Sequence, residues 1–325
     1  MSGLTFVDVC SGAGGLALGL ERAGFEPRLL LDEDDDACRT LRANRPHWNV
    51  LQADLLDFDP SEHPESHDVD LLSAGLPRVK SNATAARGES GDEEQLLKAA
   101  VYLTHAVGPR ALLVENVPTL ADSDRFRDFR EFARVELEHL GYECKWFILN
   151  SADFGVPQDR RHGVLVAIKK QWFPWFRMPS PTVADHVSVG EALAPSMRSG
   201  GWKGADLWVA QATTVAPTLV GGSKNRGGAD LGLAGTKRKW EALGVNAHSL
   251  GNEIPGPDFV WAPELGRDGM VRLTVDQAAV LQSFPEEWEI TGKKTARYRQ
   301  IGQATPPPVG RVLGAAIATA LRSPA

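Results

Sequence analysis

The first 170 residues alternate short apolar runs with longer amphipathic stretches, and this alternation constrains the fold more than any other feature. The apolar runs that read as strands are Leu4–Val9, Pro27–Leu31, Asp68–Ser73, Ala111–Val114 and Gly163–Ile168. Between them, the apolar spacing is that of helices, over Gly15–Ala23, Asp35–Arg45, Asp92–Val107 and Arg125–Leu140. Strands separated by helices form a parallel sheet covered on both faces. The sequence therefore predicts an α/β fold with a doubly wound, mostly parallel sheet.

The alternation breaks between about Trp172 and Pro263, where Gly, Pro, Trp and basic residues dominate and periodicity is poor. Helical spacing returns at Val275–Gln282, and again at Val309–Leu321 after a run of three prolines. We therefore predict a first domain from residues 1–175 and 266–325, and a smaller irregular domain from residues 176–265.

The charge is distributed unevenly along the chain. Residues 1–154 contain 15 Lys and Arg against 28 Asp and Glu, a net charge of −13, whereas residues 155–325 contain 20 against 14, a net charge of +6. This asymmetry fits a small-molecule domain joined to a part that faces a polyanion, although solvated acidic surfaces give the same imbalance. Charge alone leaves both interpretations open.

The cysteines and the apolar runs indicate a cytoplasmic protein. Cys10, Cys38 and Cys144 are too few and too scattered for a disulfide framework or a zinc site, so we expect reduced thiols and no metal. We see no apolar run long enough to span a bilayer and no basic-then-apolar leader.

A glycine-rich turn follows the first predicted strand and opens directly into a helix. Glycines allow tight turning and close approach to a ligand, and the start of a helix offers free amides. Acidic residues follow the next strand about twenty residues on, where a carboxylate can bind a ribose, and Asp54 could reach an adenine amino group. The pattern favours a nucleoside cofactor, with candidate contacts at Asp8, Cys10, Gly12, Ala13, Gly14, Gly15, Leu16, Asp32, Glu33, Asp54 and Leu55.

Five motifs in order resemble those of the cytosine-5 DNA methyltransferases. They are the loop Phe6–Gly15, the glutamate motif Glu115-Asn116-Val117, the glutamine-arginine motif Gln158–His162, the segment Arg272–Pro285 and the closing motif Ile301–Val309. The resemblance runs from Phe6 to Leu321. It implies a Rossmann-like domain that binds S-adenosylmethionine (SAM), with further cofactor contacts at Gly75, Pro77 and Gln303, and an irregular domain that recognises double-stranded DNA.

One position departs from the family where its chemistry resides. The family has a Pro-Cys dipeptide after the fourth strand, and the thiolate adds to carbon-6 of a flipped-out cytosine while the glutamate holds the ring nitrogen. Here Gly75 and Pro77 keep their places, but Arg78 stands where the cysteine would be. Arginine stays protonated and offers only donors, so Arg78 cannot be the nucleophile. Cys10 replaces a cofactor-packing aromatic, and His162 replaces the last arginine of its motif.

The resemblance assigns the remaining roles. Glu115, Arg160 and Arg78 are the candidates for the catalytic site, and Gln158 and Arg161 would hold DNA near it. A basic, glycine-rich part of the middle region suits phosphate contacts, although a solvated loop has the same composition. Its cations are Lys224, Arg226, Lys237, Arg238 and Lys239.

Three functions remain open. The chain is a DNA methyltransferase that works without the thiol on a flipped-out base, or a pseudoenzyme that binds DNA and SAM as a regulator or partner, or an enzyme that modifies a flipped base by another reaction such as hydrolysis. The expected partners are double-stranded DNA and either an active methyltransferase or a restriction or defence protein. We expect a monomer, associated with the nucleoid.

Overall fold

The computed structural model describes residues 3–79, 91–221 and 229–324. Lys224 and Arg226, two predicted phosphate contacts, lie outside these residues. The chain packs as two compact units. The first contains Met1–Leu149, Arg161–Ser180 and Val309–Ala325, and the second contains Asn150–Arg160 and Pro181–Pro308. None of the helices in the described part of the chain has the length and apolarity needed to cross a membrane.

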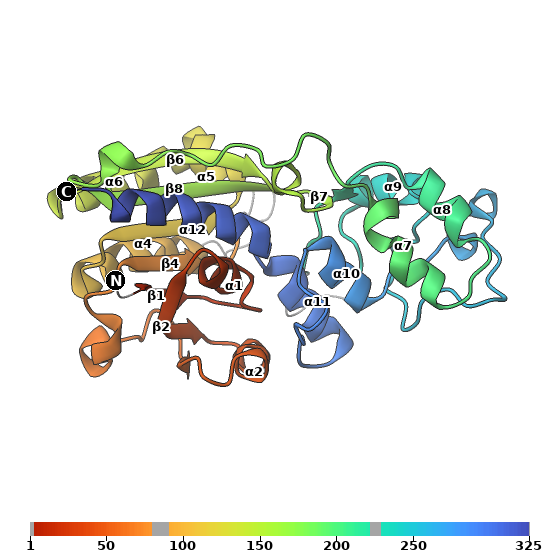
Figure 1. The fold of residues 1–325 in the computed structure, drawn as a ribbon, viewed down its shortest axis with the longest axis horizontal. Coiled ribbons are helices and arrows are strands. Elements are labelled where there is room, and N and C mark those ends of the chain that lie inside the picture. The colour runs from red at the N-terminus through yellow and green to blue at the C-terminus, as the bar shows by residue number, and fades with distance from the viewer. Residues whose placement is uncertain (1–2, 80–90, 222–228, 325) are drawn as a thin grey trace. The chain divides into compact units, whose positions relative to one another are not determined.

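The first unit is built on a seven-stranded sheet in the order β3-β2-β1-β4-β5-β8-β6 (Figure 1). The five strands from β3 to β5 are parallel, and β8 pairs with β5 in the antiparallel direction. The predicted α/β fold with a mostly parallel sheet is therefore confirmed. The strands are β1 (Leu4–Val9), β2 (Phe25–Asp32), β3 (Val50–Gln52), β4 (Leu71–Gly75), β5 (Ala111–Asn116), β6 (Tyr142–Asn150) and β8 (Arg161–Lys169).

Helices connect these strands, as the alternating pattern predicts. They are α1 (Gly15–Arg22), α2 (Asp35–Asn44), α4 (Gly91–Val107), α5 (Pro118–Asp122), α6 (Arg127–His139) and α12 (Pro307–Arg322). Short 3₁₀ turns lie at Pro60–Glu62, Pro64–Ser66, Asp124–Phe126 and Phe173–Trp175. The α12 helix begins within the proline run, because proline is tolerated in the first turn of a helix.

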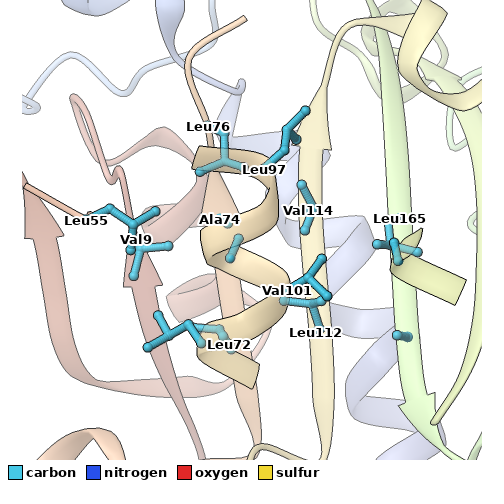
Figure 2. Close-up of a cluster of buried hydrophobic side chains, with 14 of the residues drawn as sticks. Val9, Leu55, Leu72, Ala74, Leu76, Leu97, Val101, Leu112, Val114 and Leu165 are labelled. Carbon is cyan, nitrogen blue, oxygen red and sulfur yellow. The ribbon is translucent and has the colours of Figure 1, made fainter. Parts of the chain in front are cut away.

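Alternate residues of the strands bury one face of the sheet beneath α4 and α6. Val9, Ala74 and Val114 belong to this apolar cluster, with Leu97 and Val101 of α4 lying across the strands (Figure 2). Residues of the opposite parity are also buried, so both faces of the sheet are covered. The near-continuous apolar runs in the sequence have this physical cause.

The α1 and α12 helices pack closely against each other in the first unit. A Cβ atom at Gly310 would lie 2.8 Å from the carbonyl oxygen of Leu16, and one at Gly314 would lie 2.8 Å from the Cβ of Ala23. The closing helix is thereby fixed on the helix that follows the glycine turn.

The second unit is mostly short helices around buried tryptophans. Its elements are α7 (Val189–Ser199), α8 (Ala205–Gln211), α9 (Ala234–Ala242), α10 (Val275–Leu281) and α11 (Lys294–Gln303), with the short strands β7 (Gln158–Asp159) and β9 (Ala216–Pro217) paired in parallel. Three further 3₁₀ turns lie at Ser151–Phe154, Pro263–Leu265 and Arg267–Gly269. Trp208 and Trp240 are fully buried in this unit. Its scattered apolar residues therefore form a core despite their poor periodicity.

The second unit is larger than the region 176–265 that the sequence analysis delimited. Residues 150–160 and the helices α10 and α11 pack in it. The α10 helix is joined to α7 by a hydrogen bond of 3.0 Å from Gln277 Nε2 to Ser196 Oγ. Helical periodicity identifies such helices but does not show which core receives their apolar faces.

Candidate active site

The glycine turn after β1 is wound by alternate residues in the left-handed region. Cys10, Gly12 and Gly14 have φ values of 55°, 53° and 80°. The Gly14 amide donates to Ser11 O at 2.9 Å, and the Ser11 amide donates to Leu31 O at 3.0 Å. A Cβ at Gly12 would meet no atom within 4 Å, so this glycine serves the backbone conformation and leaves its surroundings open. Ala13, Gly15 and Leu16 are buried behind the turn.

Asp32, at the end of β2, fixes this turn from the side. Its Oδ2 accepts a hydrogen bond of 2.7 Å from the Gly12 amide, and its Oδ1 accepts one of 2.8 Å from the Asp34 amide. Burial raises the pKa of Asp32, and these two backbone donors act against that rise. Asp32 was predicted to lie at the cofactor. In the structure each of its oxygens accepts a hydrogen bond from the protein backbone.

Two exposed acids lie at the ends of neighbouring strands. Glu33 directly follows β2, and Asp54 follows β3 and accepts a 2.9 Å hydrogen bond from the Leu56 amide. The side chain of Leu55, next to Asp54, is buried. Because β1, β2 and β3 are parallel neighbours, the open glycine turn and these carboxylates share one edge of the sheet. An open backbone turn beside carboxylates suits the hydroxyls and amino group of a nucleoside cofactor.

Asp8 is a buried carboxylate at the end of β1. Its Oδ1 accepts a 2.5 Å hydrogen bond from the hydroxyl of Ser73 on β4. Its Oδ2 is buried and has no hydrogen-bond partner among the residues that the structure describes. Burial raises the pKa of Asp8 from 3.8 to about 7, against the hydrogen bonds from Ser73 and Ser11. Near neutral pH this carboxyl can therefore carry a proton.

The loop after β4 is held by the side chain of Asn116 at the end of β5. Asn116 Oδ1 accepts from the Val79 amide at 3.1 Å, and its Nδ2 donates to the carbonyls of Leu76 at 3.3 Å and Pro77 at 3.1 Å. Asn116 is fully buried. These bonds fix the backbone on both sides of Arg78. Gly75 precedes this loop, and a Cβ there would approach Cys10 O to 3.4 Å.

Glu115, Arg78 and His162 form a charged cluster beside this loop. His162 Nδ1 lies 2.5 Å from Glu115 Oε1, and Arg78 Nη2 lies 3.9 Å from the same oxygen. The side chains of Glu115 and His162 are buried, and that of Arg78 is 28% exposed. In the described residues, the buried Nε and Nη2 of Arg78 have no hydrogen-bond partner. Leaving a buried donor unpaired costs roughly 1–3 kcal/mol.

The antiparallel strand β8 brings His162 to the end of β5. Asn116 pairs with Gly163 in the register of the two strands. A Cβ at Gly163 would lie 2.3 Å from the carbonyl oxygen of Val117, which is closer than any side chain tolerates. The contact between His162 and Glu115 therefore depends on a glycine at the next position.

Arg160 and Gln158 are buried in the second unit, where the protein itself uses their polar groups. Arg160 Nη1 donates to the carbonyls of Leu219 at 3.0 Å and Gly302 at 2.7 Å, and its Nη2 donates to that of Gln303 at 3.2 Å. The side-chain Oε1 of Gln158 accepts from the backbone amide of Leu219 at 2.8 Å, and its Nε2 donates to Gln282 Oε1 at 2.8 Å. Both side chains were predicted to hold the DNA or its extruded base. In the structure they join segments of the second unit.

The remaining predicted DNA contacts are surface side chains. Arg161 is exposed at the start of β8. On α9, Arg238 and Lys239 are exposed, whereas Lys237 pairs with Asp230 at 2.7 Å. A hollow of about 300 Å³ is lined by Ala234, Lys237, Arg238, Glu241 and His248. Gln303, predicted to contact the cofactor, is an exposed residue of the second unit.

Three functional details escaped the sequence analysis. Ser73 is a polar residue within the apolar run of β4, and this interruption was a signal for its bond to Asp8. Asn116 belongs to the glutamate motif, but only the structure shows that it holds the loop around Arg78. His162 was noted as a departure, and its contact with Glu115 requires the antiparallel register of β8. Among the described side chains, no group of His, Cys, Asp and Glu could hold a metal ion.

Comparisons with known proteins identify the family of this chain. The family model described as C-5 cytosine-specific DNA methylase matches residues 4–319. The chain is 41% identical to the Type II methyltransferase M.NaeI of Lentzea aerocolonigenes, over 99% of this chain and 76% of that protein. It is 37% identical to the Type II methyltransferase M.NgoMIV of Neisseria gonorrhoeae, over 98% of both chains.

Solved structures share the fold at low sequence identity. A putative DNA modification methyltransferase encoded within an E. coli prophage matches with a TM-score of 0.67 and 18% identity, over 98% of this chain and 100% of the other. The S. pombe Dnmt2 methyltransferase matches with a TM-score of 0.64 and 16% identity, over 98% of both chains. The cofactor used by this family is SAM, and the open glycine turn with its neighbouring acids fits it. The chain belongs to the C-5 cytosine-specific DNA methylase family.

Proposed function

We propose that this protein binds SAM and double-stranded DNA and accommodates an extruded cytosine at Glu115. It does not perform the thiol addition that precedes methyl transfer in other members of its family. It acts as a DNA-binding pseudo-methyltransferase, alone or as a regulator or partner of an active enzyme. The observation that carries this proposal is the guanidinium of Arg78, which lies 3.9 Å from Glu115 at the position of the nucleophile.

No other thiol supports the missing step. Burial raises the pKa of Cys38 to about 11 and that of Cys144 to about 12, and it raises the pKa of Cys10 as well. At neutral pH all three remain thiols, which are far weaker nucleophiles than thiolates. Without addition at carbon-6, the cytosine ring stays too poor in electrons at carbon-5 to attack the cofactor.

The binding functions have their own support. The turn around Gly12 is held open by Asp32, and the exposed Glu33 and Asp54 are suited to the ribose and adenine of SAM. SAM supplies an electrophilic methyl group when bound. In the second unit, the exposed cations Arg238 and Lys239 are suited to phosphate contacts, which give DNA affinity without sequence specificity.

Labelling of DNA tests the proposal. The native protein and an Arg78→Cys variant are incubated with methyl-labelled SAM and mixed-sequence duplex DNA, and the DNA is digested to nucleosides for mass detection. In parallel, SAM binding is measured by calorimetry and DNA binding by filter retention. We expect binding of both ligands without label for the native protein, and label at carbon-5 for the Arg78→Cys variant. Labelled nucleosides from the native protein would refute the proposal.

A second candidate is methyl transfer that does not need a thiol. It is favoured by Glu115, which remains at the end of β5 in contact with His162 although the nucleophile is gone. The same experiment identifies this function, because the labelled nucleoside would reveal which atom receives the methyl group.

A further inference from the structure

The arginine at position 78 presents two buried donors at the place where the family has its nucleophile. Its Nε and Nη2 atoms are inaccessible to water and have no hydrogen-bond partner in the described part of the chain. Glu115 Oε1 lies 3.9 Å from Nη2, which is too far for a hydrogen bond. Buried donors without a partner are rare in folded proteins, so these two call for a physical explanation.

Glu115 supplies an acceptor beside these donors. His162 Nδ1 lies 2.5 Å from Glu115 Oε1, and a proton on Nδ1 makes the carboxylate the acceptor of this contact. The backbone on either side of Arg78 is fixed by Asn116, the residue that follows Glu115 on β5. An acceptor and a planar fork of donors are therefore held next to each other by the same strand.

This combination matches the base-pairing edge of one base. Cytosine offers a donor at N4 and acceptors at N3 and O2, whereas guanine, its natural partner, offers one acceptor and two donors. We propose that Glu115 and Arg78 together present the hydrogen-bond pattern of guanine to an extruded cytosine, Glu115 accepting from N4 and Arg78 donating to N3 and O2. This inference rests on the proposed function, because it requires DNA to deliver the base.

The pairing explains binding without reaction. Arg78 donates to N3 and O2 but offers no lone pair that could add to carbon-6, so the bound ring is not converted into a nucleophile at carbon-5. Uracil and thymine would place O4 against Glu115 and N3–H against Arg78, which sets acceptor against acceptor and donor against donor. The edge of 5-methylcytosine equals that of cytosine, so both forms would be bound. The site thus reads cytosine whether or not it is methylated at carbon-5.

A substitution series in DNA tests this assignment. Duplexes bound by the full-length native protein are selected from a random library, and each cytosine of the enriched sequence is then replaced by uracil or by 5-methylcytosine. We expect one position where uracil weakens binding by roughly 10-fold or more in the native protein and by clearly less in Arg78→Ala, where only the clash between O4 and Glu115 remains, while 5-methylcytosine has little effect. A uracil–guanine mismatch eases extrusion of the base equally for both proteins. The ratio of the two affinity losses therefore reports the contribution of Arg78 to recognition of the base.

Two further variants keep the result interpretable. Arg78→Lys retains the charge without the planar fork and should also show reduced discrimination, whereas Arg134→Ala removes a cation of α6 outside this site and should discriminate as the native protein does. Circular dichroism shows whether each variant is folded. If the protein selects a sequence but no cytosine position depends on Arg78, the inference is overturned and the proposed function stands. If no DNA is bound, both are overturned.

Discussion

The loops after β1 and β4 lie at the ends of neighbouring parallel strands, and the protein stabilises them differently. The turn after β1 is held by backbone hydrogen bonds and by Asp32, which fixes the Gly12 amide at 2.7 Å. The loop after β4 is held by Asn116, but two buried donors of its Arg78 lack partners in the described residues. The glycine turn is thus fixed by the protein's own hydrogen bonds, whereas the side chain at the centre of the loop after β4 keeps two donors that the described residues do not satisfy.

This difference separates binding from chemistry. The groups suited to SAM do not include position 78, and the groups that hold the loop after β4 do not include it either. A change at that position therefore alters what happens to a bound base while leaving both loops in place. Four variants test how far the two sides are independent.

The largest effect should come from Asp8 on the cofactor side. Its pKa is raised by burial from 3.8 to about 7, so the stability gained from the protonated carboxyl is full below about pH 4 and is lost as the pH rises through 7. Asp8→Asn mimics the protonated form. Urea unfolding at pH 8 should show Asp8→Asn to be more stable than the native protein by up to about 4 kcal/mol. At pH 4 the two should be equal, and a constant difference at both pH values would contradict the assigned burial.

Asn116→Ala tests the base side. The variant loses the hydrogen bonds to Leu76 O, Pro77 O and the Val79 amide and leaves these groups unpaired. We expect the free energy of unfolding to fall by about 3 kcal/mol, measured by urea titration. The exposed Asn49, whose side chain donates a hydrogen bond of 2.9 Å to Glu65, provides the matched control Asn49→Ala. A loss no larger than that of the control would show that the loop is held by other contacts.

Asp32→Ala sharpens the comparison through the ligand. Without the carboxylate, the Gly12 and Asp34 amides lose their acceptor and the glycine turn is no longer fixed. We expect SAM affinity, measured by calorimetry, to fall by roughly 10–100-fold, because a hydrogen bond to a charged group contributes about 1.5–3 kcal/mol. Asp35→Ala, an exposed neighbour on α2, should bind SAM as the native protein does. If Asp32→Ala binds SAM as tightly as the native protein, the conformation of the turn does not depend on the hydrogen bond from Gly12 to Asp32.

The smallest effect is expected on α9, which belongs to neither loop. Arg238→Ala should weaken DNA binding by about 3-fold and reduce the slope of log affinity against log salt by about one. Lys237→Ala should change that slope less, since Lys237 already pairs with Asp230 at 2.7 Å. Filter retention at several salt concentrations measures both. Identical slopes for all three proteins would remove α9 from the DNA-binding surface.

The sequence predicts the sheet well because local patterning and burial agree there. The predicted strand Leu4–Val9 coincides with β1, and the turn and acids fall at strand ends as expected. The antiparallel pairing of β8 with β5 was not predicted, because direction within a sheet leaves no trace in an apolar run. The nine-residue β6 was missed, since its exposed residues interrupt the apolar pattern.

The candidate site is less predictable than the fold. The departure at Arg78 was visible in the sequence, but its distance to Glu115 follows from how β4 and β5 pair. The motif containing Arg160 suggested a contact with the base, whereas its guanidinium binds the carbonyls of Leu219, Gly302 and Gln303. Residue type shows what a side chain can donate, but only packing decides which acceptor it meets.

The hydrogen bonds of Asn116 have a consequence for how such a protein can arise and be altered. They fix the backbone on both sides of residue 78 through main-chain atoms, so the path of the loop does not depend on which side chain stands there. The cysteine codons differ from some arginine codons by a single nucleotide. A single mutation could therefore convert a methylating enzyme into a protein that only binds cytosine. Protein engineers could use the same position to place a new residue beside the extruded base.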